Sequence, residues 1–133
     1  MQSKVEGQKS KVWESVSEIA EKVNNGEITA LSQVEKSLQR IAELNPEYSA
    51  IISTLNESAV KRATQIDAKI KSGEKAGRLA GVPFIAKDNF LVFGAETTAG
   101  SNILKGFKAP YQATAIERLE SEGAICVAKS NLD

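Results

Sequence analysis

The chain contains no histidine and only one cysteine among its 133 residues. Without histidine it has no imidazole base, no imidazole metal ligand and no side chain that ordinarily titrates near neutral pH. A lone cysteine, Cys126, can form neither an internal disulfide nor a thiolate cluster for zinc. Catalysis is therefore left to carboxylates, lysine, hydroxyls and backbone amides, and we expect no metal site and no cofactor bound by this chain.

An excess of charge and a long apolar run are also missing. The 17 Lys and Arg residues balance the 17 Asp and Glu residues, so the basic surface typical of nucleic-acid binding is not expected. The apolar runs at 82–86 and 124–128 are far shorter than the roughly 20 residues of a membrane helix. The N-terminus lacks the apolar segment of a secretory signal, and Cys126 in an apolar run suits a reducing compartment. We predict a cytoplasmic protein with no membrane contact.

Glycine is missing between Gly26 and Gly73, and most glycines and aromatics follow that gap. This separates a helical first half from a second half with strands and loops. A chain of this length can bury a core without disulfides or metal. We predict a flexible N-terminus over residues 1–9 and a portion of a single domain over residues 10–133.

Apolar residues at helical spacing predict three helices in the first half. Gly26 supplies the left-handed stop of the first helix, and Thr29 can cap the second. Pro46 should end the second helix, because the residue before a proline resists helical backbone geometry. A short β-branched segment between the second and third helices predicts a strand. The expected elements are helices over residues 12–23, 29–44 and 59–72 and a strand over residues 50–53.

Two apolar segments in the second half predict strands. Residues 82–86 form a near-continuous apolar run, which is typical of a strand buried on both faces. Residues 124–128 form a second such run. The long crossover between them makes a parallel pair the expected arrangement. The fold class is therefore α/β, with N-terminal helices followed by the start of a mixed, largely buried sheet that helices cover.

The crossover between those strands carries its own signals. Thr114 and Glu117 have the spacing of a capping box, in which each side chain satisfies the other residue's exposed amide. The helix that they begin should end at Gly123. Residues 90–93 suggest another short strand, and residues 94–110 form a glycine-bearing loop.

A charged triplet, Lys87, Asp88 and Asn89, comes directly after the first apolar strand of the second half. Ligands of open α/β sheets gather beyond the carboxyl ends of the strands. A lysine partly shielded from water there favours its neutral form, which can act as a base, and Asp88 or Asn89 could orient it. The alternative is an ordinary solvated turn, which composition alone favours.

Several spaced motifs resemble the amidase signature family. Residues 81–89, GVPFIAKDN, are similar to its Gly-x-Pro-x-x-x-Lys-Asp-x core, and residues 94–101 to its Thr-Thr-x-x-Ser loop. Residues 109–119 resemble the helix that follows, and residues 123–133 resemble its Gly-Ala-x-x-x-x-Lys-x-Asn-x-Asp strand and turn. The resemblance covers nearly everything after about residue 10. Within the family, the motifs are most similar to those of the A subunits of glutamyl-tRNA(Gln)/aspartyl-tRNA(Asn) amidotransferases.

The resemblance implies a catalytic Ser, cis-Ser and Lys arrangement in which Lys87 matches the lysine. That lysine takes the proton of a bridging serine, which in turn activates the nucleophilic serine against an amide carbonyl. The family's segment with both serines follows the position of Asp133, so this chain matches an incomplete amidase signature fold and is expected to be inactive alone. No substrate-binding residue is predicted.

The subfamily implies further expectations about substrate and partners. Glutamine is the small-molecule substrate, and its ammonia is used to amidate mischarged Glu-tRNA(Gln) or Asp-tRNA(Asn). The partners are the B and C subunits, of which one uses ATP and magnesium, and mischarged tRNA is met only through the complex. A stand-alone amidase acting on other small amides and a non-catalytic scaffold fragment stay open as alternatives.

Three other nucleophilic side chains are expected to have ordinary structural roles. Ser101 and Ser130 are expected in loops, where a serine hydroxyl more often bonds its own backbone than attacks a substrate. Cys126 has no cationic neighbour in sequence, so we expect an unreactive core thiol.

Overall fold

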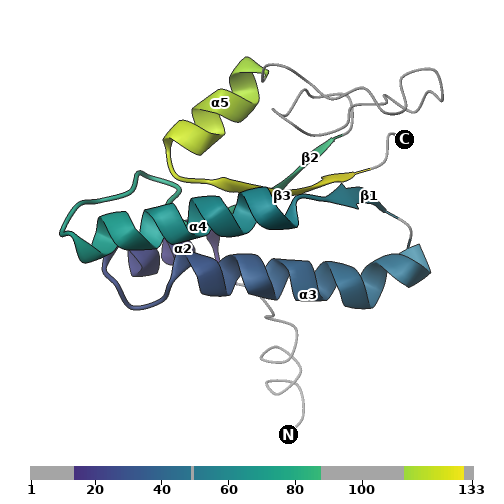
Figure 1. The fold of residues 1–133 in the computed structure, drawn as a ribbon, viewed down its shortest axis with the longest axis horizontal. Coiled ribbons are helices and arrows are strands. Elements are labelled where there is room, and N and C mark those ends of the chain that lie inside the picture. The colour runs from purple at the N-terminus through teal and green to yellow at the C-terminus, as the bar shows by residue number, and fades with distance from the viewer. Residues whose placement is uncertain (1–13, 49, 88–112, 131–133) are drawn as a thin grey trace, which may run out of the picture.

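The computed structural model describes residues 14–48, 50–87 and 113–130. This part of the chain forms four helices and three strands and confirms the mixed α/β class (Figure 1). The predicted strand at 90–93, the loop at 94–110 and the N-terminus at 1–9 lie outside the described residues. The elements are α2 (Val16–Asn24), α3 (Ala30–Tyr48), β1 (Ile51–Thr54), α4 (Asn56–Lys71), β2 (Pro83–Lys87), α5 (Thr114–Ser121) and β3 (Ile125–Ser130).

The strands form one sheet in the order β1-β3-β2. β3 runs parallel to β2, as predicted, and antiparallel to β1. Because β3 is central, it is buried along nearly its whole length. The prediction that the strand at 82–86 is buried on both faces was wrong for the described residues, since β2 is an edge strand and its Ile85 is 47% exposed.

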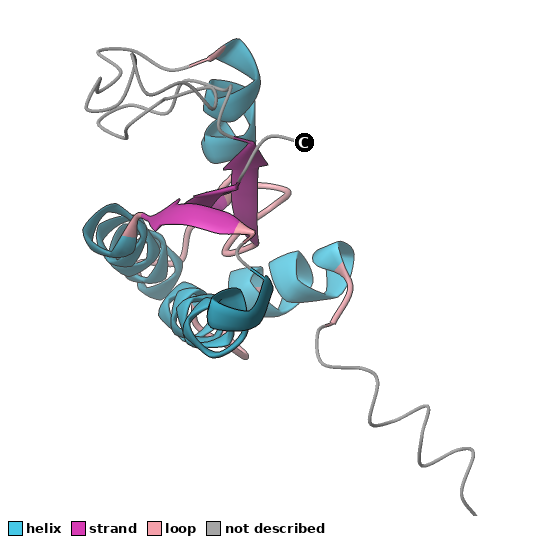
Figure 2. Ribbon diagram, turned by 90° about the vertical axis from the view of Figure 1, so that its right-hand side faces the viewer, coloured by secondary structure: helices cyan, strands magenta, loops and turns pink. Residues whose placement is uncertain are grey.

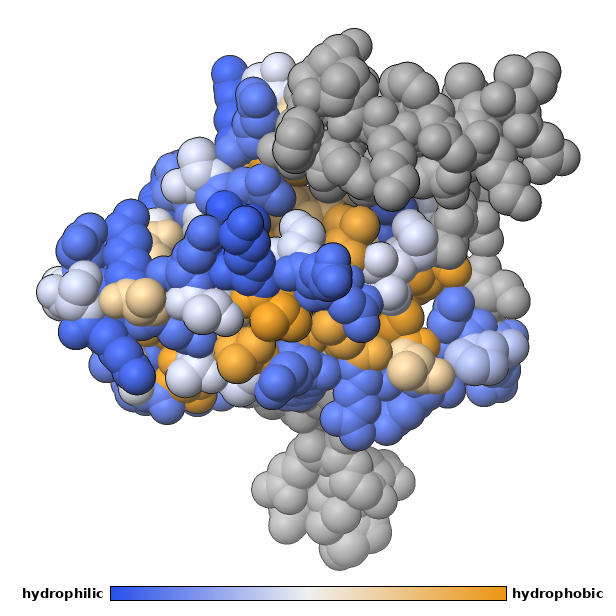
Figure 3. Space-filling view, in the orientation of Figure 1, coloured by the Kyte–Doolittle hydropathy of each residue, from blue (hydrophilic) through white to orange (hydrophobic). Residues whose placement is uncertain are grey.

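The helices lie on both faces of the sheet. α2, α3 and α4 pack beneath it, and α5 lies above it (Figures 1 and 2). The larger apolar cluster joins Val23, Val34 and Ala63 of the lower helices to Ile125 and Val127 of β3. A smaller cluster joins Ile116 of α5 to the opposite face of β2 and β3. On the face seen in Figure 3, apolar atoms form a band between hydrophilic side chains.

Polar groups set the beginnings of the helices. Ser15 caps α2 through a capping box with Glu18, so this helix begins at Val16 rather than at residue 12. The Thr29 hydroxyl accepts a hydrogen bond from the Ser32 N–H at 3.0 Å, which confirms the predicted cap of α3. Gly26 has the expected positive φ, 77°, in the turn between these helices.

The predicted end of α3 at Pro46 was wrong, because the helix continues to Tyr48. Proline has a helical φ and removes a single N–H from the helical ladder, a loss that falls only on the end of α3. The Asn45 side chain donates to the Ile51 carbonyl at 3.1 Å and accepts from the Ile51 N–H at 2.8 Å. These two bonds tie the last turn of α3 to β1 and offset the reluctance of Asn45 to adopt helical geometry.

The predicted capping box at Thr114 and Glu117 was also wrong. Ala113 is the N-cap of α5 and makes no side-chain cap bond, while Thr114 is already the first helical residue. The Glu117 N–H donates to the Ala113 carbonyl at 3.0 Å, which begins the helical ladder one residue early. The strand expected at 124–128 continues to Ser130.

Candidate active site

Lys87 is the last residue of β2, at the carboxyl end of the parallel pair, as the sequence predicted. Its register partner on β3 is Ser130. The side chain of Lys87 is exposed, so the described residues do not provide the shielding from water that we expected. Asp88 and Asn89, the proposed orienting residues, lie outside the described part of the chain, as does Ser101.

A row of three residues crosses the sheet at this end: Ile51 on β1, Ser130 on β3 and Lys87 on β2. Paired residues of neighbouring strands face the same side of a sheet. Ile51 packs against the cluster of the lower helices, so this row faces α3. Ser130 therefore belongs to a strand beside Lys87, and the prediction that it lies in a loop was wrong.

An apolar hollow lies on the same side. It has a volume of about 270 Å³ and is lined by Ile41 and Leu44 of α3, Ile51 of β1 and Ile85 of β2, among others. Ile85 and Lys87, two positions apart on one strand, face the same side. Lys87 thus stands at the margin of an apolar surface and next to a half-buried serine.

A second row of paired residues lies next to this one in the sheet and faces α5. It consists of Ser53 on β1, Lys129 on β3 and Ala86 on β2. Lys129 has no exposed surface at all, although it is charged at neutral pH in water. The sequence interpretation gave Lys129 no role of its own, although Lys129 ends a run of apolar strand residues and stands at the lysine position of the Gly-Ala-x-x-x-x-Lys-x-Asn-x-Asp motif.

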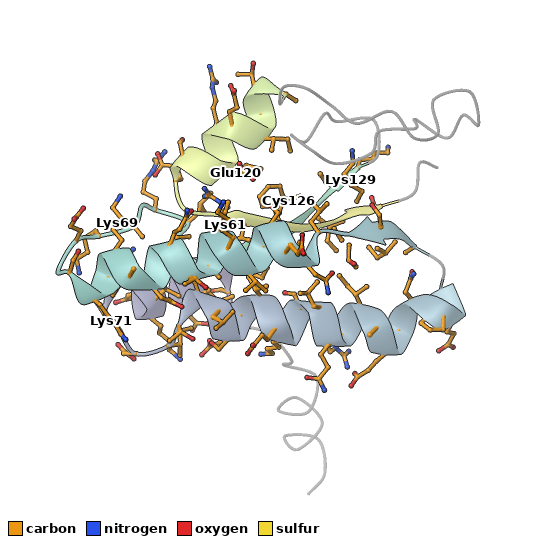
Figure 4. All side chains as sticks on the ribbon, in the orientation of Figure 1. Lys61, Lys69, Lys71, Glu120, Cys126 and Lys129 are labelled. Carbon is orange, nitrogen blue, oxygen red and sulfur yellow. The ribbon has the colours of Figure 1, made fainter. Side chains whose placement is uncertain are left out.

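Cys126 shares this face of the sheet, and Figure 4 shows it on β3 with Lys129. Burial raises the pKa of the Cys126 thiol to about 11, and backbone hydrogen bonding at Ala128 counteracts this effect only in part. The Sγ atom lies 3.6 Å from the Ala128 carbonyl oxygen. These features fit the expectation of an unreactive core thiol.

Within residues 14–48, 50–87 and 113–130, no group of three or more His, Cys, Asp or Glu side chains could hold a metal ion. In the same residues, no helix combines the length and apolar character that crossing a membrane requires.

Comparison with known proteins decides the family. The model of the Amidase family matches residues 32–133, which is most of the chain and includes both strands of the candidate site. The chain belongs to the amidase signature family. The resemblance inferred from the sequence motifs is thereby confirmed.

Among curated members of this family, two similar proteins carry the same name. The A subunit of the glutamyl-tRNA(Gln) amidotransferase from Bdellovibrio bacteriovorus is 48% identical over 119 residues, which cover 90% of this chain and 24% of that protein. The protein of the same name from Symbiobacterium thermophilum is 42% identical over 109 residues, covering 81% of this chain and 22% of that protein. The chain therefore spans about a quarter of the length of these amidase signature relatives.

Solved structures show the same fold. The native peptide amidase from Stenotrophomonas maltophilia superposes with a TM-score of 0.84 at 32% identity, covering 91% of this chain and 25% of that one. A fatty acid amide hydrolase superposes with the same TM-score, 0.84, at only 19% identity, which shows the fold alone. The described helices and strands are thus part of an amidase signature fold.

Proposed function

We propose that this chain is the N-terminal portion of the glutamine-hydrolysing A subunit of a tRNA-dependent amidotransferase, and that Lys87 is its catalytic base. The observation that carries the proposal is the position of Lys87 at the carboxyl end of β2, beside a parallel strand and two residues after Ile85, which lines an apolar hollow. The similarity to two proteins named as A subunits of glutamyl-tRNA(Gln) amidotransferase, at 48% and 42% identity, supports the choice within the family.

The proposed reaction uses the Lys87 amine and two serines supplied by chain beyond Asp133. Lys87 accepts a proton from the bridging serine, which accepts one from the nucleophilic serine as its Oγ bonds to the glutamine amide carbon. The carbon–nitrogen bond then breaks, and ammonia leaves with the returned proton. Water hydrolyses the resulting glutamyl ester to glutamate and restores the serine. Residues 1–133 alone are proposed to be inactive for this reason.

The wider assembly belongs to the same proposal. The B and C subunits would be the partners, and ATP and magnesium would be used by the partner that passes ammonia to Glu-tRNA(Gln) or Asp-tRNA(Asn). This chain would bind no cofactor and would meet tRNA only within the complex. A cytoplasmic location is proposed because protein synthesis and its tRNA substrates are found there.

The test of Lys87 uses the full-length protein assembled with its partner subunits. Lys87→Met keeps an unbranched side chain one atom shorter but removes the basic nitrogen, and loss of a general base lowers kcat by about a hundredfold or more. Lys61→Met on α4, another exposed lysine, is the matched control and should leave glutamine hydrolysis unchanged. Wild-type turnover by Lys87→Met would refute the assigned role.

A stand-alone amidase is the second candidate, and the 32% identity to a peptide amidase favours it. The two functions are separated by adding partner subunits, ATP, glutamine and Glu-tRNA(Gln) to the full-length protein. Formation of Gln-tRNA supports the amidotransferase. Hydrolysis of small amides without any Gln-tRNA supports the stand-alone amidase, and inactivity of the full-length protein in both assays would leave a scaffold role.

A further inference from the structure

Lys129 has the largest side chain among the completely buried residues of the described chain. Burying an ammonium group costs several kcal/mol before its hydrogen bonds offset that loss. An apolar residue would pack this position of the central strand at lower cost, so core packing alone does not account for a lysine. Lys129 is also one residue before Ser130, the strand neighbour of Lys87.

The pairing of β3 with β2 is irregular just before Lys129. Phe84 pairs with Cys126, but Ile85 pairs with Ala128, so Val127 is an extra residue on β3. Such a bulge changes which side of the sheet the following residues face. Cys126 and Lys129, which would face opposite sides in a regular strand, thereby share the side of α5. The pairing of Lys129 with Ala86, a member of the α5-side cluster, agrees with this placement.

β1 is irregular at the same level. Ile51 pairs with Ser130 and Ser53 pairs with Lys129, which leaves Ile52 as an extra residue on β1. Both neighbours of the central strand therefore adjust their register around Lys129. Bulges of this kind re-aim side chains and are frequent beside active sites.

The bulge on β3 decides which residue stands next to Lys87. If the register set by Phe84 and Cys126 continued without an extra residue, Lys87 would pair with Lys129, and two ammonium groups would stand side by side on the α3 face. Like charges directly opposite each other on neighbouring strands are destabilising. With the bulge, Lys129 is buried on the α5 face and Ser130 takes the place beside Lys87.

We propose that Lys129 is a positioning residue whose buried ammonium maintains the bulge at Val127 and hence the register that sets Ser130 beside Lys87. In this proposal the charge of the Lys129 side chain, rather than its size, fixes the register of β3. In the regular register a second ammonium group at position 129 would be repelled by Lys87, whereas an apolar side chain at position 129 would not be. Buried polar groups that specify one arrangement at the expense of stability are known in other proteins. The catalytic consequence rests on the proposed function of Lys87.

The test compares Lys129→Met and Lys129→Arg in the full-length protein. Lys129→Met should fold, with β3 in the regular register in its crystal structure, and should lower kcat for amide hydrolysis by at least about tenfold with little change in KM, because small misplacements of reacting groups reduce turnover. Lys129→Arg keeps the charge and should keep both the bulge and most of kcat. If Lys129→Met does not fold, Lys129→Gln is used in its place with the same expectation.

Two results would overturn the proposal. One is a Lys129→Met structure that retains the bulge at Val127. The other is an equal loss of kcat in Lys129→Arg, which would show that the shape of the side chain matters rather than its charge. The Lys87→Met variant is measured alongside. If Lys87→Met retains turnover, the proposed function fails, while the register in the Lys129→Met structure still tests the role of Lys129.

Discussion

The carboxylate of Asp67 on α4 accepts a hydrogen bond from the backbone N–H of Ala30, the first residue of α3, at 2.7 Å. Its second oxygen accepts from the Leu31 N–H at 3.1 Å. A helix begins with backbone N–H groups that have no partner within the helix, and a negative charge there also interacts favourably with the helix dipole. Asp67 thus caps α3 from the C-terminal part of α4 and holds the two helices together.

Removing this remote cap should destabilise the protein. We expect Asp67→Ala to lower the free energy of unfolding by about 1–2 kcal/mol, because two backbone N–H groups lose their acceptor. Asp67→Asn keeps one acceptor oxygen but no charge and should fall between Asp67→Ala and the parent. Urea unfolding followed by circular dichroism measures the change, with Gln65→Ala on an exposed position of α4 as the control. Equal stability of Asp67→Ala and the control would contradict the prediction.

Gly77 fits where no other residue can. Its φ is 108°, and a Cβ atom added there would lie 2.3 Å from the carbonyl oxygen of Glu122. That oxygen also accepts a hydrogen bond from the Leu79 N–H at 2.7 Å, so the turn after α5 cannot move without losing this bond. The close approach joins the loop before β2 to the turn before β3, and it therefore supports both strands of the candidate site.

A matched pair of glycine variants separates crowding from backbone strain. Gly73 also has a positive φ, 94°, but a Cβ atom there would meet nothing within 4 Å. Gly73→Ala should lower the unfolding free energy by about 1–2 kcal/mol, the ordinary cost of a left-handed alanine. Gly77→Ala should lower it by about 3 kcal/mol or more, because the clash adds to the same strain. Thermal and urea unfolding of both variants gives the comparison, and equal losses would show that the loop before β2 yields easily.

The sequence predicted what local patterns control. Apolar spacing located the helices, two apolar runs located the parallel strands, and motifs resembling those of a known family pointed to Lys87. It did not reveal the cap of α3 by Asp67, because the two partners are 37 residues apart and no local pattern joins them. It also did not reveal the end of α3, where the Asn45 side chain bonds to Ile51 outweigh the local effect of Pro46.

The candidate site was predicted only in part for the same reason. The position of Lys87 follows from its own strand, whereas its neighbour depends on the pairing of β2 with β3. One extra residue, Val127, changes that pairing, and because residues 125–128 are all apolar, no alternation of polar and apolar side chains indicates a bulge there. The burial of Lys129 and the placement of Ser130 in a strand therefore emerge only when the sheet is assembled.

Cys126 provides a test of how closely β3 is covered. Because burial raises the pKa of its thiol to about 11, only about one molecule in a thousand carries a thiolate at pH 8. Alkylation by iodoacetamide at pH 8 should therefore be slow in the native protein and fast in urea, where an ordinary cysteine has a pKa near 8.5. The same thiol makes the free energy of unfolding fall as pH rises from about 9 to 11. In this range the unfolded chain has already lost the thiol proton, whereas the folded protein still holds it. Native labelling at the unfolded rate would mean that α5 does not shield the strand, and Cys126→Ala, which cannot be labelled, is the control.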